Sequence, residues 1–148
     1  MSLTYNNILI AVDGSKEADK AFYKAIDIAK RNDAHLIITH IVDTRTYATV
    51  EAYDSTIVER AEKHAEDLLK EYKLEASESG LSHVSTVIEY GSPKVKISKD
   101  IAPKHNVDLI ICGAHGLNAV ERFFIGSVSE HITRYAKCDV LIVRSQAE

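Results

Sequence analysis

The chain has 148 residues, the size of one ordinary domain, and its 45% hydrophobic and 27% charged residues argue against wholesale disorder. The 18 lysines and arginines and 22 aspartates and glutamates leave a net charge of -4. That charge argues against a general binder of nucleic acid or anionic membranes, which would need a basic surface. No apolar run approaches the roughly 18 residues of a membrane span, and no export signal is visible. We therefore expect a single cytoplasmic domain over residues 1–148.

Short apolar runs alternate along the chain with stretches of helical periodicity. A continuous apolar run at 8–12 predicts a strand buried on both faces. The period then changes, and residues 15–29 predict an amphipathic helix with Ser15 as its N-cap. The run at 36–42 predicts the second strand.

The middle of the chain continues this alternation. Residues 57–72 predict a second amphipathic helix, and 84–90 predict the third strand. Pro93 is suited to the first position of a third helix, with the preceding serine as its cap. Pro103 lies late in that segment, so we expect the helix to kink or stop near Ile101.

The last third of the chain contains two further buried strands. Residues 107–112 and 140–143 are the apolar runs that predict them. The stretch between them is not clearly periodic until 127–130. There the sequence Ser-Val-Ser-Glu predicts a capping box that opens a short helix to Tyr135.

Five buried strands separated by four helices predict a doubly wound, Rossmann-like α/β fold, with a parallel sheet and helices on both faces. The last strand is nearly all apolar. If it lies at a sheet edge it needs a cover, and a second copy of the chain would supply one. We therefore expect a homodimer formed through the strand from Val140 to Val143.

The residues that follow the strands are the candidates for ligand binding, because doubly wound sheets bind at the carboxyl ends of their strands. Asp13 follows the first strand and Asp43 the second. Gly113 and Gly116 follow the fourth and allow a close approach of backbone to ligand. Gly126-Ser127 then offers free amides and a hydroxyl at a helix start, which suits an anion.

The spacing of these glycines, with two residues between Gly113 and Gly116 and nine before Gly126-Ser127, resembles the nucleotide motif of the universal stress protein family. The resemblance covers nearly the whole chain and is to the members that bind ATP. It implies a sheet order of 3-2-1-4-5, which places the first and fourth strands side by side. It also implies an ATP-binding, dimeric regulator of the stress response.

The resemblance further implies a role for each binding residue. Asp13 would hold the ribose hydroxyls, and the backbone at Ile41 would meet the adenine edge. The phosphates would be surrounded by the glycine string and the start of the following helix: Gly113, His115, Gly116, Gly126, Ser127, Val128 and Ser129.

The loop around the expected phosphate site has no lysine, and Arg122 is its one fixed cation between residues 114 and 125. Because ATP adds negative charge to an acidic chain, we expect Mg²⁺ to accompany it, held mainly by phosphate oxygens rather than by protein ligands. The chain has neither a GxxxxGK[ST] string nor a G-x-S-x-G elbow. We therefore predict no catalytic residue, and hydrolysis that is slow or absent.

Three functions remain open on the sequence. The first is an ATP-binding regulator that acts through a protein partner the sequence does not identify. The second is a slow ATPase or nucleotidyl hydrolase of related α/β architecture. The third is a dimeric interaction module that uses no nucleotide.

Overall fold

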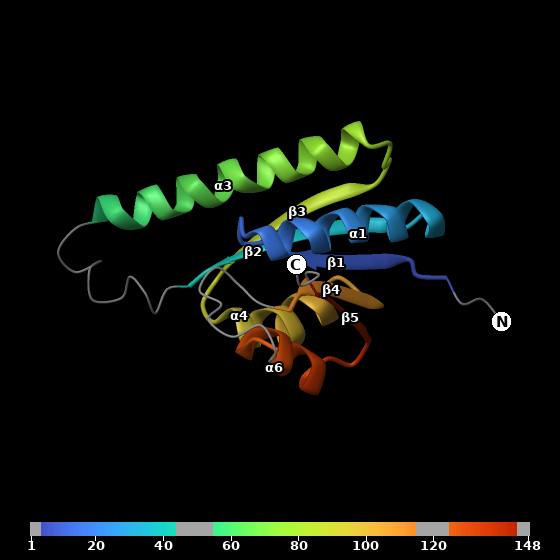
Figure 1. The fold of residues 1–148 in the computed structure, drawn as a ribbon. Coiled ribbons are helices and arrows are strands. Elements are labelled where there is room, and N and C mark those ends of the chain that lie inside the picture. The colour runs from blue at the N-terminus through green and yellow to red at the C-terminus, as the bar shows by residue number, and fades with distance from the viewer. Residues whose placement is uncertain (1–3, 44–54, 115–124, 145–148) are drawn as a thin grey trace.

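The computed structural model describes residues 4–43, 55–114 and 125–144. Within these ranges one sheet has the strand order β3-β2-β1-β4-β5, and every pair of neighbours is parallel (Figure 1). This confirms the predicted doubly wound sheet and its order. The strands are β1 (Asn7–Ala11), β2 (His35–Val42), β3 (Val84–Tyr90), β4 (Leu109–Gly113) and β5 (Asp139–Val143).

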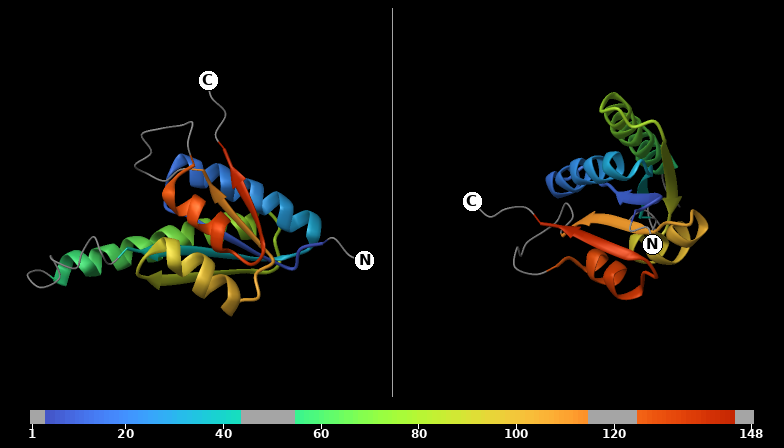
Figure 2. Two further views of the ribbon diagram at one scale, coloured as in Figure 1. Left: turned by 90° about the horizontal axis from the view of Figure 1, so that it is seen from below. Right: turned by 90° about the vertical axis from the view of Figure 1, so that its right-hand side faces the viewer.

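Helices cover both faces of the sheet, as the sequence predicts (Figure 2). The helices α1 (Lys16–Asn32) and α3 (Ser55–Glu78) pack on one face. The other face carries α4 (Pro93–Val95), η1 (Lys96–Ile101), α5 (Ala102–Lys104) and α6 (Ser127–Tyr135). The central strands supply both cores: Ile38 packs toward the first pair of helices, whereas Ile37, its neighbour on β2, packs toward the second group.

The first helix begins where the sequence predicts. Ser15 is the N-cap of α1, and its hydroxyl accepts a hydrogen bond from the Ala18 N–H at 3.1 Å. Glu17 lies in the first turn, where a negative charge is favoured by the helix dipole. The buried stripe predicted for this helix is present and includes Ala18, Phe22 and Ala25.

The predictions about two helix ends need correction. The helix that starts at Pro93 does not stop near Ile101, which was one of the two expected outcomes, but continues to Lys104 and changes from π-helix to α-helix after Ile101. At the end of η1 the Ala102 N–H donates to the Ile97 carbonyl, five residues back in the chain. Pro103 follows, and as a proline it has no N–H that would need an acceptor. The predicted capping box is not formed either, because Ser127 is already helical, Gly126 is the cap residue, and no side chain caps α6.

Helix α3 has 24 residues, and in Figure 1 its N-terminal half extends beyond the sheet. Its C-terminal half is anchored by buried residues that include Leu69, Tyr72 and Ala76. The Tyr72 ring meets the Phe22 ring of α1 edge-on, with centroids 4.8 Å apart. In the described part of the chain, no helix combines the length and apolar character needed to cross a membrane.

Candidate functional site

A pocket of about 410 Å³ lies at the carboxyl ends of β1, β2 and β4, where the strand order reverses. Its volume falls in the range of roughly 300–1,000 Å³ that is typical of small-molecule sites. The structure places most of the predicted binding residues in its wall: Asp13, Ile41, Gly113, Gly126, Ser127, Val128 and Ser129. His115 and Gly116 lie outside the described residues, as does Arg122.

The turn between β1 and α1 fixes the carboxylate of Asp13. Its Oδ1 accepts the Ser15 N–H at 2.9 Å, and Gly14 adopts a positive φ of 83°. Only a residue without Cβ takes up that conformation at little cost. A carboxylate can accept more than one hydrogen bond, so Asp13 retains the capacity to accept from a ligand hydroxyl.

Gly113, the last residue of β4, lies where the sheet meets both α1 and α6. A Cβ at this position would approach the backbone carbonyl group and the Cβ of Glu17 to 3.1 Å. From the other side, the Ser129 hydroxyl donates to the Gly113 carbonyl at 2.6 Å. The Ser129 hydroxyl is therefore committed to holding β4 against α6, and a phosphate would meet only its main-chain N–H.

The N-terminus of α6 supplies the donors of this end of the pocket. The Gly126 N–H is taken by the Ala114 carbonyl at 2.7 Å, and the first intrahelical bond runs from the Glu130 N–H to Gly126. The intervening amides have no intrahelical partner, and they carry the positive end of the helix dipole. These amides belong to the pocket residues Ser127, Val128 and Ser129.

The opposite end of the pocket is apolar. Ile41 of β2 is 8% exposed, and Pro93 and Ile97 face it from the helical segment that follows β3. Ile97 lies in the π-helical segment η1, and its carbonyl accepts from the Ala102 N–H five residues along. A flat, weakly polar group such as a nucleobase fits this lining.

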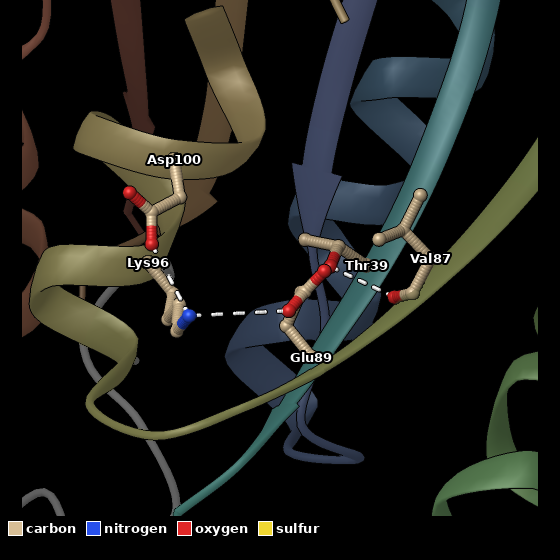
Figure 3. Close-up of polar contacts among 5 residues, drawn as sticks. All are labelled: Thr39, Val87, Glu89, Lys96 and Asp100. Carbon is tan, nitrogen blue, oxygen red and sulfur yellow. Dashed lines mark hydrogen bonds and ion pairs between the residues drawn. The ribbon is translucent and has the colours of Figure 1, made fainter. Parts of the chain in front are cut away.

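Polar contacts behind this wall hold β2, β3 and η1 together (Figure 3). Thr39 also lines the pocket, and its hydroxyl donates to the Val87 carbonyl at 2.9 Å. Lys96 lies 4.0 Å from Glu89 and 3.2 Å from Asp100. Both ion pairs are partly exposed and contribute little stability each. Only the Lys96–Glu89 pair joins η1 to β3, because Lys96 and Asp100 both belong to η1.

Several pocket residues were not predicted from the sequence, namely Thr39, His40, Pro93, Ile97 and Cys112. The Nδ1 atom of His40 lies 2.8 Å from the Val12 carbonyl oxygen. Burial raises the pKa of the Cys112 thiol to about 11, so it is protonated at neutral pH. Proximity to a strand end could have identified His40, which directly precedes Ile41 at the carboxyl end of β2.

The electrostatics of the pocket suit a ligand that brings its own counter-ion. Among the described residues in its wall, none is a lysine or an arginine, and Asp13 adds a negative charge. The donors that remain for an anion are main-chain amides and the Ser127 hydroxyl. No group of three or more histidine, cysteine, aspartate or glutamate side chains within the described ranges is arranged to hold a metal ion.

The fold and this pocket define a small doubly wound α/β protein with a pocket at its switch point. The model of the universal stress protein family matches residues 4–144, and the chain belongs to that family. It is 56% identical over 144 residues to a universal stress protein homologue of Staphylococcus haemolyticus, covering 97% of this chain and 87% of that protein.

Solved structures agree with this assignment. The universal stress protein UspA of Lactobacillus plantarum is similar with a TM-score of 0.84 and 32% identity, over 97% of this chain and 100% of that one. A universal stress protein in complex with cAMP is similar with a TM-score of 0.69 and 26% identity, over 95% and 98% of the two chains.

Proposed function

We propose that this protein binds ATP and acts as a nucleotide-dependent regulator of the stress response. The observation that carries the proposal is the pocket, which gathers Asp13, Ile41, Gly113 and the start of α6 at one switch point. A relative with this fold is in complex with cAMP, which is an adenine nucleotide. The protein partner through which such a regulator would act stays unidentified.

Each part of the pocket suits one part of the nucleotide. Asp13 would accept from the ribose hydroxyls, and the main chain of Ile41 would meet the adenine edge. The triphosphate would lie at the N-terminus of α6 beside Gly113. Micromolar affinity needs about 8 kcal/mol, of which a helix N-terminus supplies up to about 2 kcal/mol. The adenosine end must therefore provide most of the affinity.

The direct test is calorimetric titration of the purified protein with ATP and Mg²⁺. Asp13→Asn should weaken binding by about 10- to 100-fold, because hydrogen bonds to a charged group contribute roughly 1.5–3 kcal/mol. It keeps an oxygen for the Ser15 N–H, so the turn should survive. Asp33→Asn, an exposed carboxylate at the far end of α1, is the matched control and should bind normally. Absence of ATP binding by the wild type, or equal binding by both variants, would contradict the proposal.

Mg²⁺ should accompany the nucleotide, because the described pocket wall offers no lysine or arginine to the phosphates. The ion would be held mainly by phosphate oxygens. Titrating ATP in the presence of Mg²⁺ and again with EDTA tests this expectation. Affinity should be lower with EDTA, and equal affinity in both conditions would refute it.

We further propose that hydrolysis is slow or absent. Fast phosphoryl transfer needs a cation clamp and an oriented attacking group. The described pocket residues offer neither a fixed cation nor an activated nucleophile, since the Cys112 thiol is held protonated by burial. Phosphate release followed over hours should stay near the uncatalysed background, and release clearly above that background would favour the alternative of a slow ATPase or nucleotidyl hydrolase.

The homodimer is proposed to form through β5, which lies at one end of the sheet order. The Val143 carbonyl faces β4, where it accepts the Ala114 N–H, so the main-chain groups of Val140 and Ile142 face away from the sheet. Ile142→Pro removes one outward N–H and should yield a monomer by sedimentation, whereas Ile142→Val should remain dimeric. A wild-type monomer at micromolar concentration would refute the dimer.

A further inference from the structure

The ladder between β1 and β2 ends at the pocket, with Ala11 and Thr39 as its last pair. The Val12 N–H donates to the Thr39 carbonyl at 2.9 Å, so the main-chain groups of Thr39 face β1. Alternate residues of a strand face the same neighbour, and Val42 faces β3, where its carbonyl accepts the Gly91 N–H at 3.0 Å. The main-chain N–H and C=O of Ile41 therefore point to the β1 side, beyond the end of that strand.

The next rung would run from the Ile41 N–H to the Val12 carbonyl, but the β1–β2 register ends at Ala11 and Thr39. The Val12 carbonyl is met by the His40 ring instead, with Nδ1 at 2.8 Å. A carbonyl oxygen only accepts, so Nδ1 carries the proton and donates. A side chain thus takes up one of the two lone pairs of the carbonyl oxygen that would pair with the Ile41 amide in the next rung.

We propose that His40 is a positioning residue for the nucleotide: by holding the Val12 carbonyl it leaves the main chain of Ile41 to the base. The same hydrogen bond fixes the peptide that immediately precedes Asp13, so one side chain orients both ends of the adenosine site. This inference rests on the proposed function for its ligand. The hydrogen bond between His40 and the Val12 carbonyl is present without a ligand.

Two substitutions separate this role from general packing. His40→Leu fills similar space without a donor, so the Val12 carbonyl, in a residue that is 4% exposed, loses its partner. The Ile41 N–H is the nearest replacement donor along the ladder. His40→Asn places an amide N–H at the same distance from Cβ as Nδ1 but has no atom that corresponds to Nε2. If the Nδ1–H donor is what positions the nucleotide, His40→Asn should keep the ATP affinity that His40→Leu loses.

The experiment compares the wild type and both variants by ATP titration with Mg²⁺, after thermal unfolding has shown that each is folded. His40→Leu should weaken ATP binding about tenfold, the effect of losing one well-formed hydrogen bond. His40→Asn should bind within about threefold of the wild type. Unchanged affinity in His40→Leu, or equal losses in both variants, would overturn the proposal.

Amide hydrogen exchange of the ligand-free proteins gives a second readout that does not depend on nucleotide. The Ile41 amide should exchange readily in the wild type and in His40→Asn. In His40→Leu it should be protected at least tenfold more strongly, because the rung to Val12 closes. Equal exchange in all three proteins would overturn the inference. A wild type that binds no ATP would instead refute the proposed function, and the exchange data alone would then decide the role of His40.

Discussion

Gly113 is the position where the smallest substitution should have the clearest effect. A Cβ there would lie 3.1 Å from the carbonyl carbon, the carbonyl oxygen and the Cβ of Glu17, whereas ordinary contacts begin at 3.4 Å. Gly113→Ala therefore requires the first turn of α1 to move by about 0.3 Å, and two of the three atoms are backbone, which cannot rotate away. Over-packing of this kind costs about 1–3 kcal/mol.

Urea denaturation of Gly113→Ala measures this cost, and Gly14 provides the contrast. Gly14 has a positive φ of 83° but room for a Cβ, since its nearest neighbour would be Leu68 at 3.6 Å. Asparagine tolerates that conformation better than alanine, so Gly14→Asn should be more stable than Gly14→Ala. At Gly113 the cost is steric, so Gly113→Asn should be no more stable than Gly113→Ala. A Gly113→Ala protein within about 0.5 kcal/mol of the wild type would refute the reasoning.

Two further predictions concern single hydrogen bonds, and a third concerns the titration of a histidine. Ser15→Ala should lower the free energy of unfolding by about 1 kcal/mol in urea, because the N-cap bond of α1 is lost. Ser129→Ala should lower it by about 1–3 kcal/mol and yet change ATP affinity less than threefold, because its hydroxyl is bound to Gly113; a large affinity loss at unchanged stability would contradict this. Burial, and then neighbouring histidines, lower the pKa of His35 below 6.5. The unfolded chain therefore binds the extra proton more readily, and stability should fall as the pH drops below about 6.5. His35→Gln should reduce that slope in urea titrations at pH 7 and 5, and an unchanged slope would contradict this.

The fold was predictable because its signals are local and repeated. Apolar runs such as 8–12 and 36–42 read as strands buried on both faces, and the two-sided cores confirm that reading. Ser15 could be identified as a cap from its place before a periodic segment. The alternation of strands and helices then leaves few topologies, because parallel crossovers are right-handed.

The errors and omissions arise where tertiary contacts decide. Pro103 predicts a kink or an end of the helix near Ile101, but the helix continues through a π-helical segment to Lys104, and sequence alone does not show where a helix widens. Ser127 has the sequence of a cap, yet Gly126 takes that position. His40 was missed because its role depends on a carbonyl that lies 28 residues away in the chain.

The turn that carries Asp13 is held from α3 as well as from β2. The Tyr72 hydroxyl donates to Asp19, in the first turn of α1, at 2.5 Å, and burial and this bond raise the pKa of the phenol. Leu68, one turn earlier on α3, packs next to Gly14. A ligand that repositions Asp13 would therefore shift the contacts of α3, and a partner that moved α3 would alter the Asp13 carboxylate. Free-energy coupling between two sites is reciprocal, so a change in these α3 contacts and a change at the Asp13 turn would each affect the other.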